Sequence, residues 1–296
     1  CTQMKIKHIL VIADQQDKKQ SALAQAKHLS EQYQATLHVV AFNYESLSTL
    51  TSHLNDKKPE DIKQDILTSG QLWLAKQISE LNLQNQATHD VIWEKDIGAW
   101  VSNHCASHSY DLIVKTGHRS ESNFYVPTDW HLMRNNLVPT LLVAEKKWRK
   151  KQAIMVTVDL GTQVKSKQAL NQKLIDAGKS LATNSNMPLH VCYSLPISPV
   201  LKDLGIVDAK VALKDAKQKY SPVIKKMLGD DQFSSENIHI KTGVAEKVIP
   251  SLASKHNAAL VIIGSVGRKG LKAKVLGNTA ESVLALLKTD ILVIQP

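Results

Sequence analysis

The chain has 296 residues with a formal net charge of +10, and 43% of the residues are hydrophobic and 22% charged. These fractions are close to those of ordinary globular proteins, which excludes a mostly disordered, collagen-like or coiled-coil chain. No apolar run approaches the ~18 residues of a membrane span, and no secretory signal pattern is present. The three cysteines are too few for a disulfide framework. We therefore expect a cytoplasmic protein.

Short apolar runs alternate with longer segments of helical period along the whole chain. In the first half the apolar runs predict strands near 7–13, 36–42, 89–94, 111–116 and 140–144. In the second half they predict strands near 153–158, 188–194, 236–241, 259–264 and 290–294, with helices near 165–184, 201–228, 245–256 and 277–288. Continuous Val/Ile/Leu runs separated by helices are typical of parallel strands buried on both faces. The sequence therefore predicts an α/β protein with a doubly wound, five-stranded parallel sheet in each half.

The two halves repeat one plan. Three apolar segments of the first half, which begin at residues 8, 111 and 139, match segments of the second half that begin 145, 148 and 151 residues later. Such a period is too long for a solenoid repeat and indicates a duplicated domain. We place the domains at 1–146 and 152–296, joined by the short polar linker 145–151. A link of this length predicts that the domains share an interface.

One glycine-rich segment of the second domain could bind an anion. It reads Gly264-Ser-Val-Gly-Arg-Lys-Gly270 after a predicted strand, and Gly277-Asn-Thr-Ala-Glu281 then opens a helix. Glycine lets a backbone approach a phosphate closely, and a helix N-terminus offers N–H groups and partial positive charge. The segment is neither a Walker A loop nor a Gly-x-Gly-x-x-Gly fingerprint. From the residues alone it fits an anion cradle or a glycine-rich turn equally well.

The glycine spacing nevertheless has a recognisable form. Gly264-x2-Gly267-x9-Gly277, with Val158-Asp159 far upstream, resembles the nucleotide-binding pattern of the universal stress protein family. The run 127–132 (Pro-Thr-Asp-Trp-His-Leu) and the run 277–281 resemble the tandem-domain, E-type members, and the resemblance covers the whole chain. It implies two universal stress domains of the adenine nucleotide alpha-hydrolase-like fold. It also implies a monomer, because two fused domains can pair within one chain.

The same resemblance implies which residues would contact a nucleotide. Asp159 corresponds to the family's contact with adenine and ribose, and Val191 or Cys192 to a backbone contact with adenine. Gly264, Gly267 and Gly277 correspond to the glycines around ribose and phosphates. Asn278 stands where the pattern has a Ser or Thr hydroxyl, with Thr279 beside it. The implied cofactor is ATP or another adenine nucleotide.

The first domain departs from this pattern. Thr116, Arg119 and, approximately, Val126 stand at the three glycine positions, although Asp14 matches Asp159. Without those glycines a backbone cannot approach a triphosphate closely. We therefore predict that the first domain has lost the nucleotide site.

We expect neither a metal site nor catalytic residues. His104 and His108 stand four residues apart, a spacing that can bind zinc on a helix, but no second cluster at a recognisable spacing supplies further ligands. No Gly-x-Ser-x-Gly elbow occurs, and no cysteine has Lys or Arg beside it. The chain is expected to bind ligands rather than to turn them over.

The charge is concentrated in the second half. Residues 1–148 hold 15 Lys/Arg against 16 Asp/Glu, whereas residues 149–296 hold 22 against 11. Many of these lysines lie within 201–228, on what we expect to be the solvated face of a helix. Its expected apolar face consists of Leu204, Val207, Val211, Ala212, Ile224 and Leu228. Three functions stay open. The chain could be a stress-response protein that binds an adenine nucleotide in its second domain, or it could bind an apolar ligand with an anionic head where the domains meet. It could also use the basic half to bind RNA, DNA or protein.

Overall fold

The structure is a computed structural model that describes residues 4–16, 18–47, 58–118, 126–144, 147–229, 233–265 and 278–296. Its strands in the first domain are β1 (His8–Ile12), β2 (Thr36–Asn43), β3 (Ala87–Trp93), β4 (Leu112–Thr116) and β5 (Thr140–Val143). Those of the second domain are β6 (Ala153–Val158), β7 (Leu189–Leu195), β8 (Ile238–Thr242), β9 (Ala258–Gly264) and β10 (Asp290–Ile294).

The helices separate these strands as expected for a doubly wound fold. The first domain has α1 (Ser21–Tyr33), α2 (Pro59–Glu80), α3 (Ile97–Ser107) and α4 (Pro127–Asn135). The second has α5 (Lys165–Ser185), α6 (Pro199–Asp203), α7 (Ala209–Leu228), α8 (Ala245–Lys255) and α9 (Asn278–Leu286), with a 3-10 turn, η3 (Ser235–Asn237), before β8. Within the described ranges, no helix is both long and apolar enough to span a membrane.

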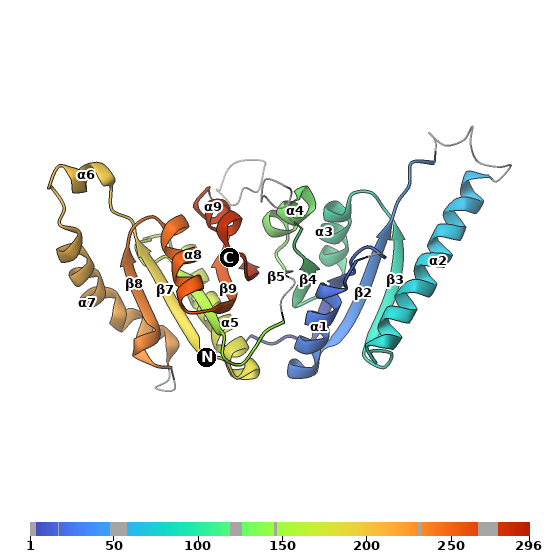
Figure 1. The fold of residues 1–296 in the computed structure, drawn as a ribbon, viewed down its shortest axis with the longest axis horizontal. Helices are drawn as coiled ribbons and strands as arrows, with labels where there is room; N and C mark the ends of the chain where they lie inside the picture. Colours follow the sequence, from blue (N-terminus) through green and yellow to red (C-terminus); the bar gives the residue numbers. More distant parts are fainter. Residues whose placement is uncertain are drawn as a thin grey trace.

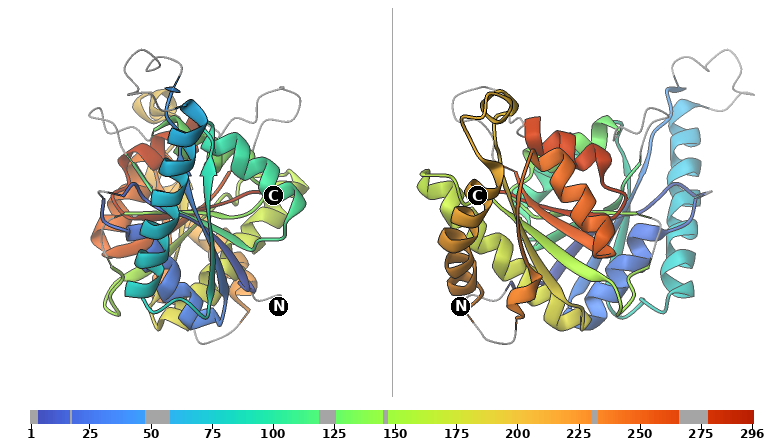
Figure 2. Two further views of the ribbon diagram at one scale, coloured as in Figure 1. Left: turned by 90° about the vertical axis from the view of Figure 1, so that its right-hand side faces the viewer. Right: turned by 60° about the vertical axis from the view of Figure 1, so that its left-hand side comes forward.

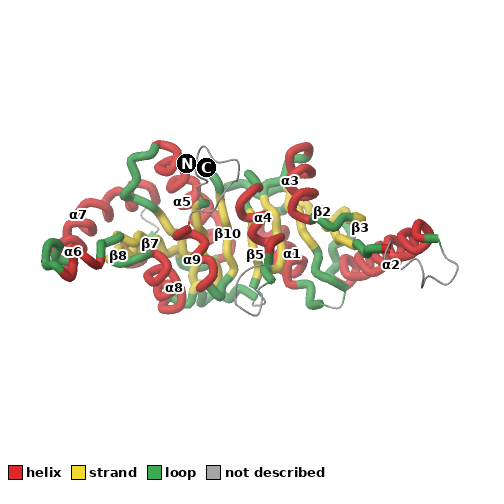
Figure 3. Tube along the Cα trace, turned by 90° about the horizontal axis from the view of Figure 1, so that it is seen from above, coloured by secondary structure: helices red, strands yellow, loops and turns green. Residues whose placement is uncertain are grey.

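The ten strands of the described residues form one continuous sheet, in the order β3-β2-β1-β4-β5-β10-β9-β6-β7-β8 (Figure 1). Every neighbouring pair is parallel except β5 and β10, which are antiparallel. Helices cover both faces of the sheet (Figure 3), and the strands fan out across it (Figure 2) because each strand twists right-handedly. The predicted fold class is confirmed.

The strands are apolar throughout because both faces are buried. In β1, Ile9 and Val11 belong to the core on one face, whereas Leu10 and Ile12 belong to the core on the other. The first of these cores continues without interruption from the first domain into the second. The two domains thus share one core as well as one sheet.

The prediction of a single helix over 201–228 is wrong. The chain forms the short helix α6, passes through Gly205 with φ +67°, and starts α7 only after Asp208, whose carboxylate caps the N–H groups of Lys210 and Val211. The expected apolar face is also partly wrong, since Leu204 is 68% and Val211 54% exposed. Ile224 and Leu228 of the expected face are buried, and Ala216 is buried beside them. The lysines of α7 are exposed, as expected of a solvated face; they are Lys210, Lys214, Lys217, Lys219, Lys225 and Lys226.

The junction between the domains is the antiparallel pair β5–β10. Leu142 is paired with Ile291 and Leu141 with Leu292. Helices α4 and α9 lie side by side above this pair (Figure 1), joined by an ion pair in which the Arg134 guanidinium donates to Glu281 Oε1. The expectation that the two domains share an interface within one chain is confirmed.

A buried carboxylate ties the linker to the junction. Asp290, the first residue of β10, is 1% exposed and accepts hydrogen bonds from the Ala144 N–H at 2.7 Å and from Trp148 Nε1 at 2.8 Å. Burial raises the pKa of Asp290 from its ordinary 3.8 to about 7, although both hydrogen bonds act in the opposite direction.

This raised pKa predicts a pH-dependent contribution to stability. Between pH 3.8 and about 7 the unfolded chain has lost the Asp290 proton and the folded chain has kept it, so stability falls as pH rises. The loss amounts to at most roughly 4 kcal/mol across that window. Urea unfolding of wild type and Asp290→Asn at pH 4.5, 6 and 7.5 measures it as the difference between the two proteins. If that difference is the same at all three pH values, the carboxyl is not buried as described.

Candidate functional site

The carboxyl ends of β6 and β9 form the corner where the sequence predicts a nucleotide site. Asp159 directly follows β6, and its backbone is fixed by the buried side chain of Asn171 on α5. The Asn171 Oδ1 accepts from the Asp159 N–H at 2.9 Å, and Asn171 Nδ2 donates to the Asp159 carbonyl at 2.7 Å. The Asp159 side chain itself is exposed. A fixed backbone with an exposed carboxylate presents a hydrogen-bond acceptor to a ligand at this corner.

Two glycines stand at this corner in places where a side chain would meet neighbouring atoms. A Cβ at Gly264, the last residue of β9, would lie 2.8 Å from Leu170 Cδ2 and 3.1 Å from Leu174 Cδ1. A side chain at position 264 would therefore have to displace Leu170 and Leu174 of α5, whatever ligand binds. A Cβ at Gly161 would lie 3.1 Å from the Tyr193 hydroxyl, whose pKa burial raises to about 12.

The other predicted residues are placed in different ways. Asn278 and Thr279 are the first two residues of α9, so their backbone N–H groups belong to its first turn. Gly267 and Gly277 lie outside the described residues. Val191 and Cys192 are each 1% exposed and lie inside the sheet, paired with β6 on one side and with β8 on the other. They are thus not brought to the corner.

The matching corner of the first domain is occupied by its own polar side chains. Asp14 is 6% exposed, and the Thr116 hydroxyl donates to Asp14 Oδ2 at 2.7 Å. The same hydroxyl accepts from the N–H of Ala22 in the first turn of α1, at 3.0 Å. His118 Nε2 lies 3.8 Å from Asp14 Oδ1. The carboxylate that is exposed in the second domain is therefore held internally in the first.

A buried ion pair completes this network. Lys115 Nζ lies 2.7 Å from Asp129 Oδ1, and it also contacts the Thr116 carbonyl at 2.9 Å and His118 Nδ1 at 3.1 Å. Asp129, fully buried in the first turn of α4, accepts from the His118 N–H at 2.8 Å. Burial, and next the Lys115 charge, lower the pKa of His118, which favours a neutral ring that accepts from Lys115.

Sequence reasoning missed this network, although it left a signal. The second domain has Ile263 and Gly264 at the strand end where the first domain has Lys115 and Thr116. A lysine that closes an otherwise apolar, fully buried strand needs an internal counter-charge. Asp129 supplies that counter-charge from the helix that Pro127 begins.

Comparison with known proteins decides the family. The model of the universal stress protein family matches the chain twice, at residues 5–143 and 151–295. The chain belongs to the universal stress protein family. It is 29% identical over 311 residues to the universal stress protein E homolog of Haemophilus influenzae, covering 99% of this chain and 98% of that protein. It is also 29% identical over 300 residues to universal stress protein E of Escherichia coli K12, covering 98% and 94%.

Solved structures show the same tandem fold. A crystal structure of a functionally unknown protein from Pseudomonas aeruginosa PAO1 superposes with a TM-score of 0.71 at 24% identity, covering 98% of this chain and 93% of that one. A universal stress protein from Archaeoglobus fulgidus gives a TM-score of 0.65 at 14% identity, covering 97% and 98%. The arrangement of two universal stress domains therefore extends over the whole chain.

The buried pair of the first universal stress domain predicts a non-additive pair of substitutions. Lys115→Ile, which introduces the residue that the second domain has at this position, should cost about 3–5 kcal/mol because it leaves Asp129 buried without a cation. The double variant Lys115→Ile/Asp129→Asn should recover most of that loss, since the amide is neutral and still accepts from His118. Urea unfolding of the three proteins tests this. A single variant within about 1 kcal/mol of wild type, the range of an exposed ion pair, would mean that the pair is not buried.

Proposed function

We propose that the second domain binds an adenine nucleotide, with ATP as the first candidate, and that the protein acts in the cytoplasmic stress response through binding rather than turnover. The observation that carries the proposal is the contrast between the two corners. Asp14 is held by the Thr116 hydroxyl, whereas glycine at position 264 leaves Asp159 without that partner and exposed. The duplicated fold thus fills one corner with side chains and leaves a carboxylate exposed in the other.

The chemistry of the second corner suits a nucleoside with a phosphate group. The Asp159 carboxylate can accept hydrogen bonds from the two hydroxyls of a ribose. The N–H groups in the first turn of α9 can bind a phosphate, and the Asn278 amide can donate where other family members are expected to offer a hydroxyl. The predicted cradle also includes Gly267 and Gly277, which lie outside the described residues.

The contact with adenine requires a revised position. The last pair between β6 and β7 joins Val158 to Tyr193, so β7 extends beyond the end of β6 at Ser194 and Leu195. The Leu195 carbonyl accepts from the Gly243 N–H on the β8 side, whereas Ser194 has no partner residue on β6, unlike Val191 and Cys192. We therefore assign the backbone contact with adenine to Ser194.

The same corner supports binding better than hydrolysis. Hydrolysis of a phosphoanhydride needs a group that orients or deprotonates water beside the phosphates. Glu281, which lies in the first turn of α9, is held by Arg134 of the other domain. Asp159 is assigned to the ribose, so neither carboxylate is positioned as a general base.

A second candidate function rests on a cavity of about 430 Å³ where the linker meets the second domain. Trp148, Ala253 and Leu287 contribute apolar walls, and Lys288 contributes an ammonium group. This combination fits a ligand with an apolar body and an anionic head. Decyl phosphate should bind in calorimetry and Lys288→Gln should weaken it; equal affinity in both proteins would contradict this candidate.

The nucleotide proposal predicts that two matched substitutions differ. Asp159→Asn should weaken ATP binding about 10- to 100-fold, because hydrogen bonds to a charged group contribute roughly 1.5–3 kcal/mol. Asp14→Asn, the same change in the other domain, should leave ATP affinity unchanged. Isothermal titration calorimetry of both variants and wild type measures this, with thermal unfolding as a check on folding.

Equal losses of affinity in the two variants would contradict the assignment to the second domain. Absence of any heat or thermal stabilisation with millimolar ATP, ADP or AMP would contradict nucleotide binding itself.

A further inference from the structure

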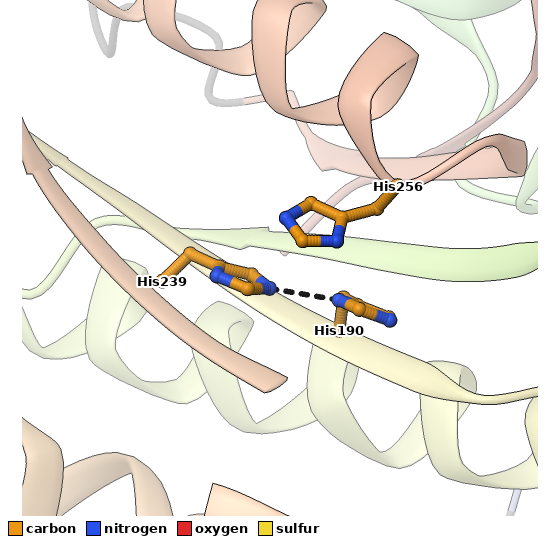
Figure 4. A group of neighbouring side chains, drawn as sticks. All are labelled: His190, His239 and His256. Atoms are coloured by element: carbon orange, nitrogen blue, oxygen red, sulfur yellow. Dashed lines mark hydrogen bonds between the residues drawn. The ribbon is translucent and has the colours of Figure 1, made fainter. Parts of the chain in front are cut away.

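Three histidines of the second domain converge near the amino ends of β7 and β8, whereas the glycine corner lies at carboxyl ends of strands. Figure 4 shows the three side chains. They are His190 on β7, His239 on β8 and His256 at the end of α8, and each offers a ring nitrogen within 4.8 Å of the others. His190 Nδ1 and His239 Nε2 are 2.7 Å apart and share a hydrogen bond. The ring of His256 lies 4.3 Å from that of His239 and 4.6 Å from that of His190 between centroids.

The fold itself brings these residues together. His239 is paired with Cys192, so its side chain points to the same face of the sheet as those of Cys192 and His190, two residues apart on β7. Helix α8 covers that face and ends at His256, after which Asn257 with φ 50° turns the chain into β9. Because His190 and His239 are each the second residue of a strand, the cluster lies at the amino ends of the strands.

The electrostatic environment keeps the rings neutral. Burial lowers the pKa of His190 and of His239 to about 4, and it lowers the pKa of His256 as well. The charges of Lys241 and Lys255 act in the same direction on His239 and His256. Neutral imidazoles each retain one lone pair, which is the form that binds a metal ion. The carbonyl end of α8 adds partial negative charge beside the cluster, which partly offsets the two ammonium groups.

We propose that His190, His239 and His256 form a binding site for a zinc-class divalent metal ion. Three imidazoles match the ligand preference of Zn²⁺, Cu²⁺ and Ni²⁺, whereas Mg²⁺ and Ca²⁺ require oxygen ligands. A tetrahedral Zn²⁺ with Zn–N bonds of about 2.0–2.1 Å places its nitrogens about 3.3 Å apart. To bind the ion, His190 and His239 must separate slightly, and the ring that donates their shared hydrogen bond must carry its proton on its other ring nitrogen, so that both facing nitrogens offer a lone pair.

Three protein ligands leave one coordination position for water or another ligand, and the exposure of His239 and His256 provides the route to it. His190 is buried, whereas the other two side chains are half-buried. An exposed fourth position is the arrangement found in zinc sites that exchange a ligand rather than in closed structural sites.

The first domain provides an internal comparison. Leu37-His38-Val39 matches Leu189-His190-Val191, Asp90 stands at the position of His239, and His108 ends α3 as His256 ends α8. There His38 has both ring nitrogens bonded, Nε2 to Asp90 at 2.8 Å and Nδ1 to the Tyr110 hydroxyl at 2.5 Å. His38 and His104 of the first domain also lie ring to ring, but both bond the Tyr110 hydroxyl, whereas in the second domain the three ring nitrogens face one another. His108 is exposed and offers a matched control.

Zinc titration of the untagged full-length chain by isothermal titration calorimetry tests the site. Wild type should bind one Zn²⁺. His239→Gln and His256→Gln should each lower the zinc affinity at least about tenfold, since even residues that only orient metal ligands contribute that much to affinity. His108→Gln should bind zinc like wild type. Co²⁺ should give the visible absorption of a four-coordinate ion in wild type and His108→Gln alone.

Two results would overturn the proposal. In the first, His239→Gln and His256→Gln both bind zinc as tightly as wild type does, and circular dichroism shows that both variants are folded. The other is no zinc binding by wild type, which would leave the cluster as a hydrogen-bonded pair with a stacked third ring. Because the cluster and Asp159 lie at opposite ends of the strands, Asp159→Asn should not change zinc affinity, so the two proposals fail or succeed separately.

Discussion

The antiparallel pairing of β5 with β10 is the interaction on which the rest of the molecule depends. Each domain alone would end in an apolar edge strand with unpaired N–H and C=O groups. Such an edge can pair with another chain and cause aggregation. Pairing satisfies those groups and buries Leu141, Leu142, Ile291 and Leu292 to 2% exposure or less. The core on one face then runs across the junction, and Asp290 fixes the linker to it. The two domains consequently form one sheet that neither could complete alone.

Because the shared sheet holds the two domains together, the residues at the strand ends of one domain can differ from those of the other without separating the domains. In the first domain the corner holds the buried pair of Lys115 and Asp129, whose burial costs the desolvation of both charges. In the second domain the corresponding corner keeps Gly264 and an exposed Asp159, and the histidines lie near the amino ends of β7 and β8. The same fold thus has internally bonded side chains at the strand ends of the first domain. In the second domain it has an exposed carboxylate at one end of the strands and histidines at the other.

Sequence reasoning predicted the strands and the duplication well because both depend on local apolar runs; β6 and β10 have the predicted bounds. It failed for 201–228, where helical periodicity continued through Gly205 although the residues there face solvent. It did not find the histidine cluster, because only the register of β7 with β8 and the turn after α8 bring together residues 49 and 17 positions apart. The Leu-His-Val repeat in both halves was the available signal. The polar network of the first domain likewise depends on contacts 102 and 11 residues apart, which no local pattern displays.

We propose that the two domains differ in function because side chains fill one strand-end corner, whereas the other leaves Asp159 exposed. Native mass spectrometry of the intact chain in increasing ATP measures this directly, because it counts ligands per chain. A single nucleotide should bind to each chain, and no second one should follow at saturation. Two nucleotides per chain, or a single one that persists in Asp159→Asn and is lost in Asp14→Asn, would contradict it.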